Sequence, residues 1–152
     1  MLAPHAAIIT TMHSYLVALR ISGQTLDVAE VTAKLRLKPT QTRVAGQQRP
    51  GGKSRWNESM WEYEVLPSNK KSKSEWSSLE EGLAEILLTF RTHKRMLRQF
   101  QRRFKVCLFC GHFSSSFDGG PTLSPSLLRQ LGDFGVELFL DTYFSDDSSA
   151  SD

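Results

Sequence analysis

Two short segments far apart in the chain share nearly the same pattern, and this repeat limits the folds that are available. Gly23-Gln-Thr-Leu-Asp27 and Gly120-Pro-Thr-Leu-Ser124 each place a glycine in a turn, followed four residues later by a side chain that caps helices well. An apolar residue comes four positions after each cap, at Val31 and Leu128, as in amphipathic helices. Each segment therefore predicts the start of a short helix.

Both predicted helices lie between segments with the periodicity of strands. Residues 15–21 alternate, then a helix begins at Asp27 and ends before Pro39, and residues 60–66 alternate again after a short strand at 42–45. In the second half, strands at 106–113 and 136–143 flank a helix at 125–131. The chain thus predicts two strand–helix–strand halves.

Residues 76–104 form the most strongly helical stretch between these halves. Apolar side chains recur at three- and four-residue spacing, with acidic residues near the start and arginines at the end, as the helix dipole favours. The apolar pattern weakens at residues 92–95, so we expect one kinked helix or two successive helices.

These elements predict an α+β fold. Two strand–helix–strand halves that share one sheet, joined by a long amphipathic helix, give a ferredoxin-like mixed sheet with helices against one face. We expect a single domain at residues 14–144, a flexible N-terminal extension at 1–13 and a disordered acidic tail at 145–152. Met12 is an alternative start of the protein.

Composition excludes several classes of protein. The 152 residues fit one domain, and two cysteines cannot form a disulfide framework, which favours a reducing compartment. No run approaches the ~20 apolar residues of a membrane-spanning helix. A secretory signal requires a basic segment before its apolar stretch, and no Lys or Arg precedes the Ile8-Ile9 pair. We therefore expect a cytoplasmic protein, with no membrane contact and no cofactor.

The sequence resembles the family called domain of unknown function 4279 over residues 14–143. The resemblance is carried by Tyr15-Leu-Val-Ala-Leu-Arg-Ile-Ser-Gly23 and by scattered positions that follow it: Val31, Leu35, Leu37, Pro39-Thr40, Gly46, Trp61 and the closing Asp141-x-Tyr143. It implies a fold and a bacterial cytosolic setting. The family has no established activity, so Pro39, Gly46, Trp61, Asp141 and Tyr143 are motif residues without an assigned role.

Three features of the sequence bear on possible catalytic or metal chemistry. Cys107 and Cys110 have C-x-x-C spacing, but residues three apart in a strand point to opposite faces, so we expect two core thiols and no metal site. Gly46 to Lys53 has one residue too many for a phosphate loop and precedes a strand. An enzyme with a carboxylate-based site stays as an alternative, because the sequence leaves open whether any two of its candidate carboxylates meet: Glu58, Glu62, Glu64, Glu137 and Asp141.

The net charge of +3 conceals strong polarisation along the chain. Residues 34–55 and 91–105 each carry seven Lys and Arg and no acid, whereas residues 130–152 carry six acids and no Lys or Arg. In the second basic segment, positively charged residues lie at helical spacing and form a stripe: Arg91, Lys94, Arg95, Arg98 and Arg102. The candidate binding residues are therefore Arg49, Lys53, Arg55 and Trp56 in the loop, and Arg95 and Arg98 on the helix.

We expect a non-enzymatic protein-interaction domain, an immunity-type or adaptor protein that occludes a protein partner. The alternative is an RNA- or other nucleic-acid-binding domain that uses the basic helix and loop, with bases stacked on strand aromatics if their face is uncovered: Phe109, Phe113, Phe139 and Tyr143. An apolar patch beside Trp56 and Trp61 would favour the protein partner, and a basic strip beside bare aromatics would favour RNA.

Overall fold

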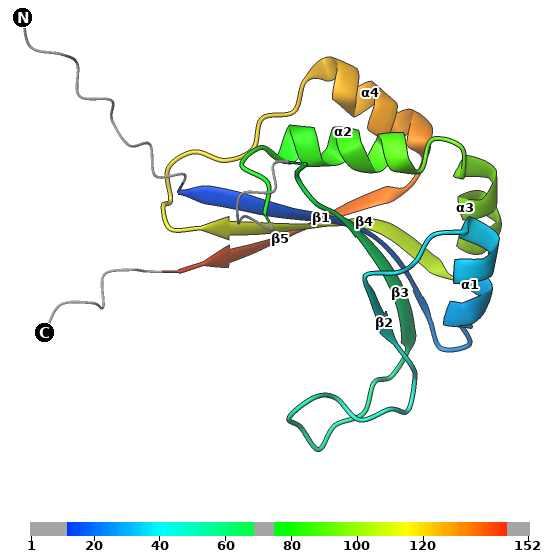
Figure 1. The fold of residues 1–152 in the computed structure, drawn as a ribbon. Coiled ribbons are helices and arrows are strands. Elements are labelled where there is room, and N and C mark those ends of the chain that lie inside the picture. The colour runs from blue at the N-terminus through cyan, green and yellow to red at the C-terminus, as the bar shows by residue number, and fades with distance from the viewer. Residues whose placement is uncertain (1–11, 69–74, 146–152) are drawn as a thin grey trace, which may run out of the picture.

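A computed structural model describes residues 12–68 and 75–145 of the chain (Figure 1). The described part is α+β, with a five-stranded mixed sheet and four helices. The elements, in chain order, are β1 (His13–Gly23), α1 (Val28–Leu35), β2 (Gln41–Arg43), β3 (Ser59–Val65), α2 (Leu79–Thr89), α3 (Lys94–Gln101), β4 (Lys105–Ser114), α4 (Pro125–Phe134) and β5 (Glu137–Phe144).

The strand order is β2-β3-β1-β4-β5, so the first strand lies at the centre. β1 pairs antiparallel with both β3 and β4, and β2 pairs antiparallel with β3. β4 and β5 are parallel neighbours joined through α4. The second predicted strand–helix–strand half is therefore present as adjacent strands. In the first half, the strand parallel to β1 is β2, and β3 lies between them.

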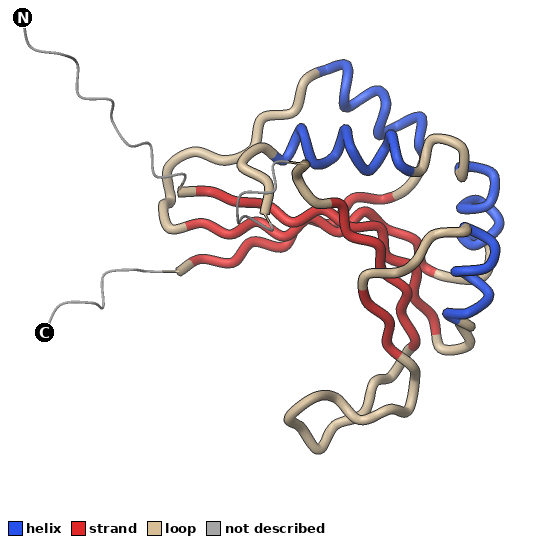
Figure 2. The backbone as a smooth tube through the Cα atoms, in the orientation of Figure 1, coloured by secondary structure: helices blue, strands red, loops and turns tan. Residues whose placement is uncertain are grey.

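The helices gather on one side of the twisted sheet (Figure 2). Alternate residues of β1 face them, and Val17, Leu19 and Ile21 are fully buried there. Trp61 and Leu108 occupy the same face in the neighbouring strands, opposite Ile21 and Leu19. The core thus forms between one sheet face and the apolar sides of the helices, because period-two and 3.6-residue patterns meet there.

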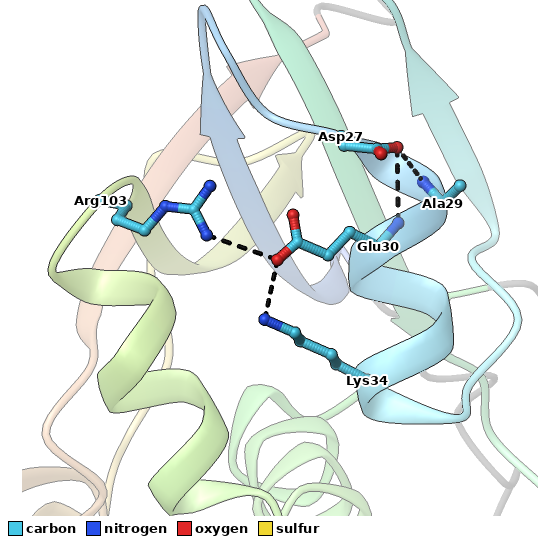
Figure 3. A network of polar contacts seen from close by, with 5 residues as sticks. All are labelled: Asp27, Ala29, Glu30, Lys34 and Arg103. Carbon is cyan, nitrogen blue, oxygen red and sulfur yellow. Dashed lines mark hydrogen bonds and ion pairs between the residues drawn. The ribbon is translucent and has the colours of Figure 1, made fainter.

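The repeated segments begin helices as their sequences predict. Asp27 Oδ1 accepts hydrogen bonds from the amides of Ala29 and Glu30, at 2.9 and 3.4 Å (Figure 3). Ser124 Oγ accepts from the amide of Leu127 at 3.2 Å. The carboxylate of Glu30 forms ion pairs with Lys34 Nζ at 2.8 Å and with Arg103 at 3.4 Å. The pair with Arg103 connects α1 to the segment before β4.

The long predicted helix is two helices. α2 ends at Thr89, and α3 begins at Lys94 after a turn that contains Phe90 and His93. Phe90 is fully buried, and His93 Nε2 lies 3.0 Å from the carbonyl oxygen of Leu35. The chain turns here because these two side chains dock on the core and on α1, which a straight helix would prevent.

The first described strand is β1, and the last is β5, which ends at Phe144. β1 begins at His13, and the carbonyl oxygen of Met12 accepts a hydrogen bond from the Ser115 amide at 3.0 Å. Residues 1–11 of the predicted extension and 146–152 of the predicted tail lie outside the described residues. Among the helices described, none has the length and apolar character needed to cross a bilayer.

Candidate functional site

In the residues that the structure describes, one face of the sheet is free of helices. Directly paired residues share a face, so the register fixes which side chains point there. Arg20 on β1 lies opposite Glu62 on β3 and Cys107 on β4. Odd-numbered residues of β4 and β5 continue the same face. We call this surface the uncovered face.

Aromatic rings run along β4 and β5 on the uncovered face. Phe109 and Phe139 lie 5.9 Å apart between ring centroids, and Phe113 stacks on Tyr143 at 5.4 Å. The Tyr143 hydroxyl donates a hydrogen bond to the Asp141 carboxylate, which raises the pKa of Tyr143. Phe139 and Tyr143 remain about half exposed, at 52% and 48%. The sequence identified these four rings, and the structure places all of them on the face without helices.

Arg20 separates this aromatic zone from the rest of the uncovered face. Its guanidinium lies 3.4 Å from the centre of the Phe109 ring and forms an ion pair with Glu62. Arg20 and its neighbours cover Glu62 so well that this carboxylate is buried, although its alternating position predicts an exposed side chain. Sequence reasoning missed Arg20, because only the strand register brings it to Glu62.

β5 is one of the two edge strands of the described sheet, and it exposes apolar side chains on both faces. Leu138 and Leu140 are 38% and 41% exposed on the side that carries α4, where Leu128 is also exposed. Phe139 and Tyr143 are exposed on the opposite side. At the end of the strand, Phe144 stacks on Phe117 at 4.2 Å between ring centroids. This edge is the largest concentration of exposed apolar side chains in the described part of the chain.

The predicted loop site lies between β2 and β3 and gathers around Trp56. The guanidiniums of Arg43 and Arg49 lie 4.1 and 4.5 Å from the centre of the Trp56 ring. Arg55 donates to the carbonyl oxygen of Gly46 at 2.7 Å, so it braces the loop. Lys53 is exposed beside Arg49 along a neighbouring hollow. Arg43, at the end of β2, is the residue that sequence reasoning missed here.

The basic helix and the strand aromatics lie on opposite sides of the sheet. Arg95 and Arg98 are exposed on α3, in the helical layer, whereas the aromatic rings lie on the uncovered face on the other side of the sheet. An apolar patch formed by Trp56 and Trp61, which would have favoured a protein partner there, is absent from the described surface, since Trp61 is fully buried in the core. Exposed apolar side chains gather instead at β5.

The family motif residues serve the fold in different ways. Trp61 donates from Nε1 to Thr32 Oγ1 at 3.0 Å and fixes α1 on the sheet. Gly46 has φ of +84°, a conformation that favours glycine, at the turn after β2. Pro39 precedes Thr40, whose amide donates to the carbonyl oxygen of Glu62 at 2.8 Å. Asp141 and Tyr143 face outward on β5, so this pair is the part of the motif available for binding.

The carboxylates and thiols are held in structural contacts. Glu62 pairs with Arg20, and burial raises the pKa of Glu64, with Glu62 and Glu75 adding to the increase. Cys107 and Cys110 are buried free thiols in β4, and burial raises the pKa of Cys110 to about 12. Within residues 12–68 and 75–145, no group of three or more His, Cys, Asp or Glu is placed to hold a metal ion.

Taken with the fold, these surfaces define an α+β domain with a helix-free sheet face and an exposed edge strand. The chain belongs to the family described as domain of unknown function (DUF4279), whose sequence profile matches residues 11–145. No curated protein and no solved structure matches the chain.

Proposed function

We propose that this chain is a non-enzymatic protein-interaction domain that binds its partner along β5. The observation that carries the proposal is the exposure of apolar side chains on both faces of this edge strand. Edge strands of monomeric proteins are usually protected by charge, proline or a covering segment, because they otherwise pair with other chains. β5 carries two acidic residues, but most of its exposed side chains are apolar: Leu138, Phe139, Leu140, Tyr143 and Phe144.

The occupant that fits this edge is an extended segment of another protein, added as a sixth strand. Backbone groups of such a segment would hydrogen-bond to the outer edge of β5, and its side chains would contact both faces alternately. Glu137 and Asp141 point to the uncovered face beside Phe139. A complementary segment therefore carries basic residues on that face and apolar residues toward Leu138 and Leu140.

A second copy of this chain is a poorer occupant. Antiparallel pairing of two β5 strands would bring Glu137 and Asp141 of both copies onto one face, where like charges destabilise the pairing. A partner that covers β5 and is thereby blocked matches the action of immunity-type and adaptor proteins, by analogy alone. The two free cysteines support a reducing compartment such as the cytoplasm, and the family resemblance supports a bacterial setting.

Affinity purification of the full chain from its native host, followed by direct binding measurements, tests the proposal. We expect a stoichiometric protein partner whose affinity falls at least about ten-fold when Phe139→Thr and Leu140→Thr are combined. Threonine keeps strand propensity, so the sheet is retained. The matched control is Leu88→Thr, an equally exposed apolar residue on α2, which should leave affinity within about two-fold.

Hydrogen exchange adds a readout that does not depend on substitutions. Partner binding should slow exchange of β5 amides and leave those of α3 unchanged. Recovery of nucleic acid alone, of no partner, or of a partner indifferent to the β5 substitutions would each overturn the proposal.

A nucleic-acid-binding function is the second candidate, because α3 exposes several cations and has no acidic residue. Lys94, Arg95 and Arg98 lie in this helix, and Arg91 and Arg102 flank it. This candidate predicts RNA binding that weakens steeply with salt and is lost on Arg95→Glu with Arg98→Glu. Salt-independent binding, or full binding by the double variant, would exclude it. The distance of α3 from the uncovered aromatics favours the protein partner.

We also infer that the sheet is an extended ferredoxin-like sheet. The order β2-β3-β1-β4, with β1 antiparallel to both of its neighbours, supports this classification, and α4 and β5 then form an addition at one edge. An experimental structure in which β5 rather than β4 adjoins β1 would overturn the inference.

A further inference from the structure

A cavity beside the β2–β3 loop has more positive than negative charge in its lining, with two arginines and one glutamate. Its volume is about 330 Å³, and its lining includes Arg43, Arg49, Trp56 and Met60. Arg20 is close enough to act on Arg43 through its charge, and the nearby carboxylate Glu62 is already paired with Arg20. Burial, followed by the charges of Arg20 and Arg49, lowers the pKa of Arg43, and the charge of Glu62 offsets part of this decrease. A guanidinium that is partly buried beside other positive charges is strongly stabilised by an added negative charge.

Arg43 also has a hydrogen-bonding atom that is not satisfied. Its Nε is buried and has no hydrogen-bond partner in the described part of the chain. Such atoms are few in native structures, and an unseen ion or ligand is one of the standard reasons for them. A small shift of the guanidinium toward an acceptor in the cavity would satisfy this donor.

The cavity is held by a hydrogen-bonded loop rather than by free side chains. The Gly46 amide donates to the carbonyl oxygen of Trp56 at 2.8 Å, and the Trp56 amide donates to that of Gln47 at 2.9 Å. The Arg49 amide donates to the carbonyl oxygen of Ser54 at 2.9 Å. Contact with the Trp56 ring restrains the guanidiniums of Arg43 and Arg49 before any ligand arrives.

We propose that this cavity binds an oxyanion, the carboxylate or phosphate group of a small molecule, through Arg43 and Arg49. Planar guanidinium groups match the oxygens of both anions. The guanidiniums already lie against the Trp56 ring, so charge and hydrogen bonding rather than base stacking provide recognition. Glu58 also lines the cavity, but it is exposed, and water screens its repulsion of the anion. The proposed site is independent of the partner surface at β5.

Titration of the full chain with sodium phosphate, and separately with sodium acetate, tests the site. Ionic strength is held constant with sodium chloride, and NMR follows the Trp56 indole N–H and the Arg43 Nε–H, assigned with Trp56→Phe and Arg43→Gln. We expect saturable shifts of both resonances with at least one of the two anions. Saturation with phosphate alone identifies phosphate as the ligand group, and saturation with acetate alone identifies carboxylate.

Three substitutions that each remove one positive charge distinguish a specific site from a general attraction of anions to the basic loop. Arg43→Gln and Arg49→Gln should each weaken binding at least about ten-fold, and Lys53→Gln, in the same loop, should change it by less than about two-fold. Dispersed amide spectra verify that each variant is folded. Shifts that stay linear with both anions, that chloride reproduces, or that Lys53→Gln weakens as much as Arg43→Gln would overturn the proposal. None of these outcomes bears on the partner proposed at β5.

Discussion

His112 on β4 donates a hydrogen bond to His13 on β1, with 2.9 Å between His112 Nε2 and His13 Nδ1. The direction follows from the other side of the His13 ring, where Nε2 lies 2.7 Å from the carbonyl oxygen of Asp118. A carbonyl oxygen only accepts, so His13 Nε2 carries a proton, and in the neutral ring Nδ1 then offers a lone pair. Thr142 then donates to His112 Nδ1 at 3.4 Å.

Burial of His112 predicts a loss of stability in acid. Burial, and the neighbouring charge of His13, lower the pKa of His112 below its unfolded value near 6.5. The unfolded chain therefore binds more protons as pH falls below about 6.5, and the free energy of unfolding decreases until the folded pKa is passed. Urea unfolding at several pH values between about 5 and 8 measures this slope.

Substitution of each of two histidines in turn shows whether His112 causes the pH dependence of the free energy of unfolding. His112→Gln should flatten the pH dependence and cost about 1 kcal/mol near neutral pH, because a buried hydrogen-bonded ring is lost. His93→Gln is the matched control and should retain the full slope. An unchanged slope in His112→Gln would show that other groups cause the acid sensitivity.

Cys110 should be unreactive in the folded protein. Its pKa of about 12 leaves almost no thiolate near pH 8, and its side chain is fully buried. We expect slow reaction with a disulfide reagent in native buffer and rapid reaction of both cysteines in guanidinium chloride. The same raised pKa contributes stability that is complete below the unfolded pKa near 8.5 and is lost as pH rises toward about 12. Rapid native labelling of Cys110 would contradict this assignment.

Local sequence signals predicted the helix starts and the buried strand faces well. Asp27 and Ser124 cap their helices through amides two or three residues away, so the whole interaction lies within a few residues. Alternation likewise predicted Val17 and Leu19 in the core. These features depend on the backbone period and on burial, which the sequence encodes directly.

Features set by long-range pairing were not predictable in the same way. Arg20 and Glu62 are 42 residues apart, and His13 and His112 are 99 apart. Only the register of β1 with β3 and β4 brings these pairs together. The break between α2 and α3 was an open alternative, because the docking of His93 against Leu35 decides it. The sequence predicted that the strand aromatics could stack on bases only if their face of the sheet was uncovered. The helices pack on the other face, so this condition is met.

Two helical glycines should respond oppositely to alanine. A Cβ on Gly82 in α2 would lie 2.7 Å from Val17 Cγ2 and 3.1 Å from the Trp76 ring, whereas a Cβ on Gly132 in α4 meets nothing within 4 Å. Gly132→Ala should stabilise by about 0.5–1 kcal/mol through helix propensity. Gly82→Ala should destabilise by about 1–3 kcal/mol through overpacking. Chemical denaturation of both variants measures the difference, and stabilisation by Gly82→Ala would show that the contact between α2 and β1 is looser.

The hydrogen bond between Trp61 and Thr32 should appear as coupling in a double-mutant cycle. Thr32→Val keeps the shape of the side chain but leaves the buried Trp61 Nε1 without its acceptor, at a cost of about 1–3 kcal/mol. Trp61→Phe removes both the hydrogen-bond donor and part of the ring volume. In the Thr32→Val background the hydrogen bond is already lost, so Trp61→Phe should reduce the free energy of unfolding by less than in the natural chain. We expect a coupling energy of about 1 kcal/mol from urea unfolding of the four proteins.

Thr89→Val is the control for that cycle. Its hydroxyl donates only along its own helix, to the carbonyl oxygen of Glu85 at 2.9 Å. The substitution should therefore change stability by less than about 0.5 kcal/mol and show no coupling to Trp61→Phe. Equal coupling of Thr89 and Thr32 to Trp61 would mean that the tryptophan stabilises the helical layer as a whole. Coupling confined to Thr32 would assign the family's tryptophan the specific task of fixing α1 on the sheet.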